Sequence, residues 1–174
     1  MPSPLAHSVT GYALAQLGVA GSIQKHWGTI TYALFVAIAP DFDFALQLLT
    51  GENYHRGATH SLLFCLGLSA IAGIISYGVN KRKAHVWFGL TLIIYASHLL
   101  LDYLTRGGSG IQFLWPLPNY YQSPILIFPS VRHWEGLFHR SHLVFLGFET
   151  LYAVLLLTLS QWIRQKGWST QPKP

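Results

Sequence analysis

The chain has 174 residues, of which 51% are hydrophobic and 10% are charged, and its mean hydropathy is +0.35. Because an ordinary soluble domain is about one-quarter charged, this composition argues against a soluble globular enzyme and favours a small polytopic membrane protein. The net charge of +5 would suit a nucleic-acid-binding protein, but the positions of the basic residues give it another explanation below.

Five apolar segments approach the roughly 17–25 residues that cross a bilayer, and they predict an all-α helical bundle in a single domain over residues 1–174. The first segment is rich in small residues, which let membrane helices approach closely. Pro40 interrupts the second segment, because proline kinks or ends a helix. Glycines and polar residues inside several segments leave a soluble helical domain with a very apolar core as the alternative. The predicted segments are residues 5–23, 27–49, 61–79, 86–104 and 142–163.

Residues 111–140 are predicted to form an outer loop or a re-entrant segment. Four prolines in this stretch exclude a long helix. Its aromatic residues, such as Trp115 and Tyr120, favour a membrane–water interface. Residues 165–174 are predicted to be a polar, frayed tail.

The basic residues predict the orientation of the bundle. Lysine and arginine concentrate on the cytoplasmic side of membrane proteins, so residues 81–83 are placed inside. Alternating the five segments then puts Lys25, Arg164 and Lys166 on the same side, with the N-terminus outside and the C-terminus inside. The positive charge is thereby explained by topology, and no nucleic-acid partner is needed. Most acids and histidines fall together on the opposite face.

Asp41 and Asp43 follow Pro40 at the predicted helix break. Two carboxylates this close repel each other unless a cation lies between them, and they suit a hard or borderline metal ion. The alternative is a pair of solvated residues that end one helix or cap the next.

His55 and His60 flank a tight turn directly before the third apolar segment. Imidazole is a common zinc ligand, and His60 is the better candidate because it lies at the start of that segment. His55 is expected to support it, and Arg56 to hold a phosphate or a carboxylate. Interfacial polar residues with a helix cap, supplied by Thr59 or Ser61, are the alternative.

His98 and Asp102 share one face of an apolar helix, because they are four residues apart. Charged groups inside membrane segments are expensive and usually functional, so Asp102 is expected to bind a metal or to orient His98. A His–Asp hydrogen bond that joins two helices is the alternative. His7, at the start of the first segment, is the fourth contributor. Glu149 lies two turns from His142, too far for both to bind one ion.

Together these motifs resemble the LexA-regulated, inner-membrane-associated metal-dependent hydrolases over about residues 1–118. The resemblance implies a multi-pass protein of the bacterial inner membrane with hydrolase activity. It rests on His7 with Gly11, Pro40-Asp41-x-Asp43, His55-Arg56-Gly57-x-Thr59-His60-Ser61, and Ser97-His98-x-x-x-Asp102 followed by a glycine-rich turn.

The order of the candidate ligands is also similar to that of the zinc-dependent phospholipase C and P1 nuclease group. Those proteins are soluble helical enzymes that hydrolyse phosphodiesters, and the later His-x-x-x-Glu motif of that group is absent here. On this resemblance, five residues would be metal ligands: His7, Asp41, His60, His98 and Asp102.

The sequence therefore predicts a membrane-bound hydrolase that uses zinc or a pair of divalent ions. A lipid phosphoester is the expected substrate, with Asp43, His55 and Arg56 as catalytic or supporting residues. Two alternatives remain open: a transporter or proton relay that uses the same intramembrane His and Asp residues, and a structural membrane protein with interfacial histidines. The sequence leaves the oligomeric state open.

Overall fold

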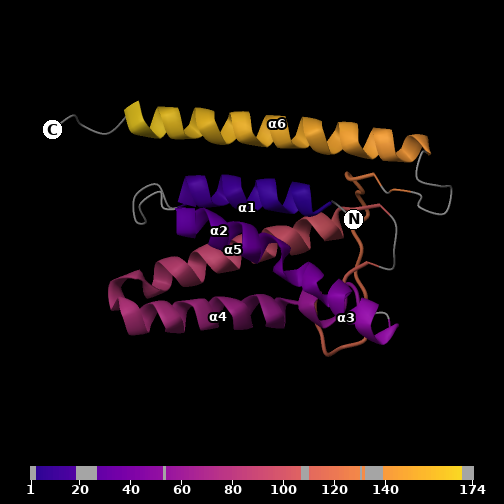
Figure 1. Ribbon diagram of the computed structural model, residues 1–174, viewed down its shortest axis with the longest axis horizontal. Helices are drawn as coiled ribbons and strands as arrows, with labels where there is room; N and C mark the ends of the chain where they lie inside the picture. The colour runs from indigo at the N-terminus through magenta and orange to yellow at the C-terminus, as the bar shows by residue number, and fades with distance from the viewer. Residues whose placement is uncertain are drawn as a thin grey trace.

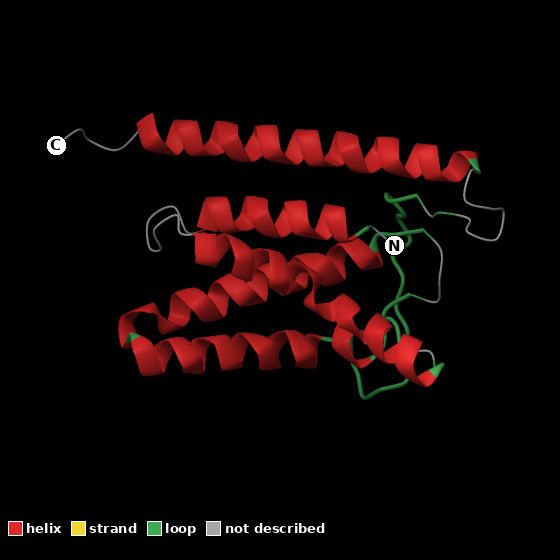
Figure 2. Ribbon diagram, in the orientation of Figure 1, coloured by secondary structure: helices red, strands yellow, loops and turns green. Residues whose placement is uncertain are grey.

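The computed structural model describes residues 3–18, 27–52, 54–106, 110–129, 131 and 139–169. Within these ranges the chain is all-helical and contains no strand, so the predicted fold class is confirmed (Figure 2). The elements are α1 (Pro4–Gly18), α2 (Trp27–Ile38), the 3-10 helix η1 (Ala39–Phe42), α3 (Asp43–Thr50), η2 (Ala58–His60), α4 (Leu62–Val79), η3 (Lys81–Lys83), α5 (Ala84–Tyr103) and α6 (Arg140–Ser169).

The long helices run back and forth along one axis (Figure 1). α6 lies along α1, α4 lies along α5, and α2 packs between α1 and α5. The starts of α1, α4 and α6 and the ends of α2 and α5 meet at one end of the bundle, which we call the site end. The turn η3 lies at the opposite end, which we call the basic end because η3 consists of two lysines and an arginine.

In the described part of the chain, four helical segments are long and apolar enough to cross a membrane, namely residues 27–50, 62–79, 81–103 and 140–166. Only 17% of the apolar stretch of α4 and 11% of that of α6 is buried against other helices. Such extensive apolar surface is unfavourable in water and suits contact with lipid chains. The described part of α1 packs against α2, α5 and α6.

The helix boundaries differ from the predicted segments mainly at the ends of the chain. α6 continues to Ser169, so residues 165–169 are helical and the predicted frayed tail is wrong there. The helix continues because polar residues beyond Ile163 find partners: Arg164 donates to Gln16, and Lys166 lies over the Trp162 ring. Residues 19–23 of the first predicted segment, Lys25, and residues 170–174 lie outside the described part of the chain.

The core lies where α1, α2 and α5 meet, and it includes Ala33, Val36 and Ile94. A Cβ atom on Gly11 would lie 2.6 Å from the Cβ of Ala37, so only glycine allows α1 to approach α2 this closely. The predicted interruption at Pro40 is confirmed, because α2 ends at Ile38 and the chain turns through η1 into α3.

The loop over residues 110–129 is fixed to the helices at the site end. Leu62 donates its backbone N–H to Phe113, Gln112 donates to Arg56, and Arg106 donates to Phe128. These bonds link the start of α4 to the end of α5. The described part of the predicted outer loop contains no helix before α6 begins at Arg140, while residues 130 and 132–138 lie outside the described residues.

α6 is joined to α1 by polar contacts along its length. Glu149, which is buried, accepts hydrogen bonds of 2.5 Å from both the backbone N–H and the hydroxyl of Ser3. Thr10 bonds to Tyr152, and Gln16 accepts from Arg164. These contacts hold α1, and therefore His7, in position between α6 and the rest of the bundle.

Candidate metal centre

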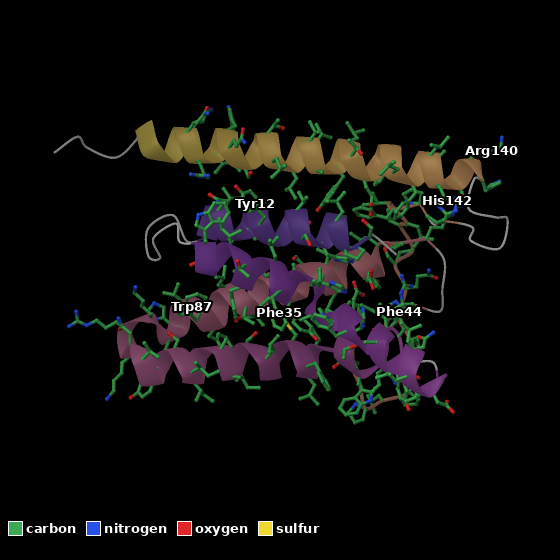
Figure 3. All side chains as sticks on the ribbon, in the orientation of Figure 1. Tyr12, Phe35, Phe44, Trp87, Arg140 and His142 are labelled. Atoms are coloured by element: carbon green, nitrogen blue, oxygen red, sulfur yellow. The ribbon has the colours of Figure 1, made fainter. Side chains whose placement is uncertain are left out.

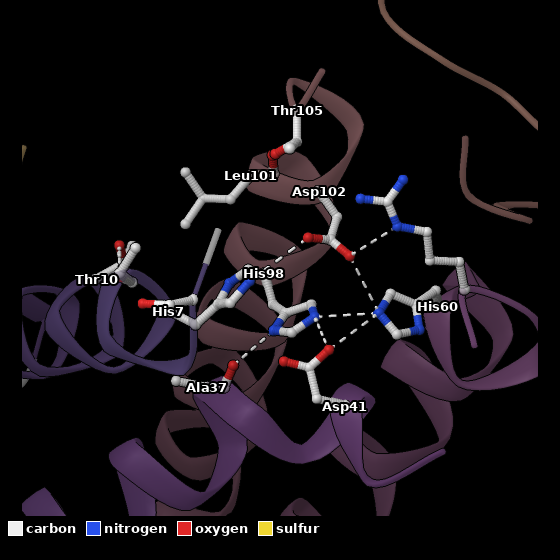
Figure 4. Close-up of polar contacts among 12 residues, drawn as sticks. His7, Thr10, Ala37, Asp41, His60, His98, Leu101, Asp102 and Thr105 are labelled. Atoms are coloured by element: carbon white, nitrogen blue, oxygen red, sulfur yellow. Dashed lines mark hydrogen bonds and ion pairs between the residues drawn. The ribbon is translucent and has the colours of Figure 1, made fainter. Parts of the chain in front are cut away.

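Four of the predicted ligands converge at the site end from three separate segments of the chain (Figure 4). Asp41 comes from η1, His60 from η2, and His98 and Asp102 from α5. His98 and Asp102 are one helical turn apart, and both are buried on the face of α5 that points into the bundle. Each of the four residues offers one ligand atom, and these atoms all lie within 4.8 Å of one another.

The spacing of these atoms suits a tetrahedral metal ion. Zinc binds nitrogen and oxygen at about 2.0–2.2 Å, which places neighbouring ligand atoms of a tetrahedron about 3.3–3.6 Å apart. The Nε2 atom of His60 lies 3.3 Å from Nε2 of His98, 3.6 Å from Oδ1 of Asp41 and 3.2 Å from Oδ2 of Asp102. Nε2 of His98 lies 3.6 Å from the same Asp41 oxygen. Four of the six edges of a tetrahedron around one zinc ion are therefore matched by these distances.

The second ring nitrogen of each histidine is anchored away from this centre. Nδ1 of His98 donates to the carbonyl of Ala37 over 2.7 Å, and Nδ1 of His60 lies 3.1 Å from Oδ2 of Asp43. Because a carbonyl or carboxylate only accepts, each ring in its neutral form carries its proton on Nδ1 and turns the Nε2 lone pair toward the centre. Metal-binding histidines are usually oriented by such a partner.

Asp43 orients the residues around His60. Its carboxylate also accepts from the hydroxyl of Thr59 at 2.8 Å, the backbone N–H of Arg56 at 3.2 Å, and Nδ1 of His55 at 2.9 Å. Asp43 and His55 therefore lie on the far side of His60 from the four-atom centre. A second group of residues that could hold an ion consists of Asp43, His55 and His60, so His60 belongs to both groups, and its Nδ1 atom faces Asp43.

Two parts of the site were not predicted from the sequence. Thr59 was considered only as a helix cap, although Ser61 is the residue that caps α4 by accepting from Phe64. The hydroxyl of Thr59 instead holds Asp43. The carbonyl of Ala37 left no signal because any residue supplies one; only its position beside His98 makes it useful.

The charges around the centre are unbalanced without a cation. Three carboxylates, those of Asp41, Asp43 and Asp102, face one guanidinium, whose Nε lies 3.7 Å from Asp102. With neutral imidazoles the group carries a charge of −2, which one divalent ion would cancel, and buried charge is stable only when paired. Among the described residues, the oxygens of Asp41 and Asp102 are buried and form no hydrogen bond of good geometry.

The carboxylates around the centre favour a positive charge on the His60 ring. Burial lowers the pKa of His60, but its contacts with the carboxylates of Asp102, Asp41 and Asp43 outweigh burial and raise that pKa to about 10. The three carboxylates therefore attract positive charge strongly to the position of the His60 ring. A divalent ion would satisfy the same attraction while displacing this proton.

His7 completes the predicted set from the α1 side. Its ring stacks on that of His98, with centroids 3.7 Å apart and planes 19° apart, and its Nε2 lies 3.5 Å from Oδ1 of Asp102 (Figure 4). This is the oxygen of Asp102 that does not face His60. His7 thus borders the centre without belonging to the four atoms closest together.

Arg56 adopts a backbone conformation that non-glycine residues rarely use, with φ of 65°. Such conformations persist where the surroundings fix them, often at functional sites. Its N–H bonds to Asp43 and its carbonyl accepts from Gln112, so both backbone groups are held. The guanidinium is thereby directed to Asp102 at the edge of the centre.

The other histidines that carry contacts lie apart from this centre. His139 bonds to Ser141 just before α6. Glu149, two turns from His142 in the sequence, is occupied by Ser3.

Comparison with known proteins gives two matches. A family described as YdjM inner membrane protein matches residues 1–168 of the chain. The Escherichia coli (strain K12) protein named inner membrane protein YbcI is 33% identical over 125 residues, which cover 67% of this chain and 68% of that protein. No solved structure matches the chain.

Proposed function

This chain belongs to the YdjM inner membrane protein family, and we propose that it is a membrane-bound, metal-dependent hydrolase that acts on a lipid or other phosphoester. The observation that carries the proposal is the four-atom centre, whose spacing suits zinc and whose two imidazoles are oriented from behind. The similarity of the ligand order to the zinc-dependent phospholipase C and P1 nuclease group supports the same reading.

In this proposal Asp41, His60, His98 and Asp102 hold the ion. A divalent ion bound there would lower the pKa of a water molecule toward about 7 and polarise a phosphoryl oxygen. Asp43 positions His60, and His55 positions Asp43. Arg56, whose guanidinium lies at the rim of the centre, would hold an anionic oxygen of the substrate, because a guanidinium matches phosphate geometry.

His7 is a further polar side chain beside the centre that could take part in the reaction. Within the described residues neither of its ring nitrogens forms a hydrogen bond of good geometry, although both are buried. Its position beside the outer oxygen of Asp102 suits either of two roles, acceptance of a proton from water or ligation of a second ion.

The test uses the full chain purified in detergent. We expect about one zinc or other divalent ion per chain by elemental mass spectrometry, together with hydrolysis of phosphoesters that a chelator abolishes. His98→Ala should lose both the metal and the activity. His85→Ala is the matched control, because His85 is exposed on the same helix outside the centre, and it should lose neither.

Three results would contradict the proposal. A bound ion without hydrolysis of any phosphoester would assign the ion a structural role. Absence of metal, together with proton flux in proteoliposomes that Asp102→Asn abolishes, would favour the relay alternative. Metal content unchanged by His98→Ala would show that the ion binds elsewhere.

A further inference from the structure

The short helix α3 carries a wide apolar surface next to the metal centre. Phe44 is 50% exposed, Leu48 is 72% exposed and Leu49 is 84% exposed. The opposite side of the same helix supplies Asp43, which is buried against His60. One face of α3 therefore belongs to the site, and the other face is largely exposed in the part of the chain that the structure describes.

The most exposed side chains of the site lie next to α3. The side chains of His60, His98 and Asp102 are fully covered, whereas that of Asp41 is 15% exposed and that of the neighbouring His55 is 17% exposed. Phe42, which is half-exposed, follows Asp41 directly, and the Phe44 ring meets that of His55 edge-on at 6.4 Å. A molecule that approaches the centre by this edge passes over aromatic side chains.

The apolar surface continues from α3 onto the membrane-spanning part of the bundle. The half-exposed Phe35 of α2 packs against Phe42, with ring centroids 5.7 Å apart. Figure 3 shows Phe35 partway along α2 and Phe44 on α3 at the site end. Residues 27–50 together form one of the candidate membrane spans, and the chain belongs to an inner membrane family. The exposed face of α3 is therefore continuous with the surface that lipid chains cover.

We propose that α3 is a lateral entrance to the site, and that the substrate is a bilayer phospholipid. Its acyl chains lie against Phe44, Leu48 and Leu49, while its phosphoester reaches the centre at Asp41, whose side chain is the least covered of the four ligands. Arg56, and a divalent ion held by the centre, would supply the opposite charge for the anionic phosphate. This inference rests on the proposed hydrolase function, and it adds the route of entry and the need for acyl chains.

The first experiment compares two substrates in the full chain reconstituted in vesicles. One substrate is long-chain phosphatidylglycerol in the bilayer, and the other is a water-soluble phosphodiester, bis(p-nitrophenyl) phosphate. Leu48→Ser with Leu49→Ser should lower kcat/KM for the lipid about tenfold or more, because two apolar contacts are lost, and leave the soluble substrate within about twofold. The matched control, Leu151→Ser with Leu155→Ser on the exposed face of α6, should change neither rate.

If the variant with Leu48→Ser and Leu49→Ser showed an equal fall in kcat/KM for both substrates, or no fall for the lipid, the proposal that α3 is the entrance would be wrong. An equal fall would show general damage to the site. An unchanged lipid rate would show that the substrate enters elsewhere.

A second measurement does not depend on activity. In a Cys65→Ser background, which removes the one native cysteine, a nitroxide is placed at Leu49→Cys. We expect its relaxation to respond to oxygen dissolved in the bilayer more than to a water-soluble nickel chelate. A label at Lys83→Cys, at the basic end, should respond in the opposite sense.

The outcomes separate this proposal from the hydrolase function. A lipid-exposed Leu49 position with no hydrolysis of either substrate would refute the hydrolase while leaving the lipid contact of α3 intact. A water-exposed position would overturn the entrance whatever the activity. Dipolar coupling between labels on two chains would also overturn it, because a second copy would then cover α3.

Discussion

Replacing Asp43 by Asn tests whether this carboxylate positions His60 or binds the metal itself. In the structure the four ligand atoms of the centre do not include Asp43, which receives Nδ1 of His60, the hydroxyl of Thr59 and the N–H of Arg56 on one oxygen and His55 on the other. Asn keeps one accepting oxygen and nearly the same shape. It loses the negative charge, and its NH₂ group cannot accept from the donor that the second oxygen serves.

The expected effect follows from this geometry. Substitution of a residue that orients a metal-binding histidine typically weakens metal binding about 10- to 100-fold, which corresponds to about 1.4–2.7 kcal/mol. Asp43→Asn should therefore retain stoichiometric zinc at micromolar free metal but bind it more weakly. Competition with a chelating dye in detergent measures this change. Asp41→Asn, which alters one of the four facing atoms, should lose stoichiometric zinc under the same conditions.

Two outcomes would refute this reasoning. If Asp43→Asn removed zinc as completely as Asp41→Asn, Asp43 would be a ligand, and the centre would lie on the other side of His60. If Asp43→Asn bound zinc as tightly as the unaltered chain, the His60 ring would not depend on this carboxylate.

Three further predictions concern proton linkage and the packing that supports the site. Zinc binds the deprotonated ring of His60, and the pKa of this ring is raised to about 10 in the metal-free protein. Zinc affinity, measured by dye competition, should therefore rise about tenfold per pH unit from pH 7 to 9. An affinity that does not change with pH would contradict this prediction. Glu149→Ala should lower thermal stability in detergent by about 1–3 kcal/mol, because it leaves the two donors of Ser3, directly before α1, without their acceptor. The exposed Glu52→Ala should be nearly neutral. Gly11→Ala should destabilise the folded protein by about 1–3 kcal/mol and reduce its metal content, because the new Cβ would lie 2.6 Å from the Cβ of Ala37 on α2. The control Gly89→Ala, whose Cβ would meet open space, should do neither. Equal stability of the two variants would refute the close packing of α1.

The spans were predictable because their signal is local. A run of apolar residues of bilayer length is readable without knowledge of its neighbours, and Pro40 marks the break between α2 and η1. The end of α6 was not predictable in the same way. Charged residues suggested a stop after Ile163, and only the partner on α1 explains why Arg164 continues the helix.

In the candidate site, too, local features were predictable from sequence and tertiary contacts were not. His98 and Asp102 could be paired from sequence because helical spacing fixes their shared face. The alternation of the spans brought Asp41 and His60 to the same end. The sequence could not show which of these residues face the ion and which support them, because the orientation of the histidine rings depends on tertiary contacts. In the structure Asp43 and His55 lie behind His60 rather than at the centre.

X-ray absorption at the metal edge of the purified full chain tests the central claim most directly, because it reports which atoms surround the ion. We predict a first shell of nitrogen and oxygen only, at about 2.0–2.2 Å, with the outer scattering of two imidazoles, and we predict that His98→Ala loses the metal-edge signal. An ion surrounded by water without imidazole scattering, a shell that contains sulfur, or a spectrum unchanged by His98→Ala would contradict the assignment of Asp41, His60, His98 and Asp102 as the metal centre.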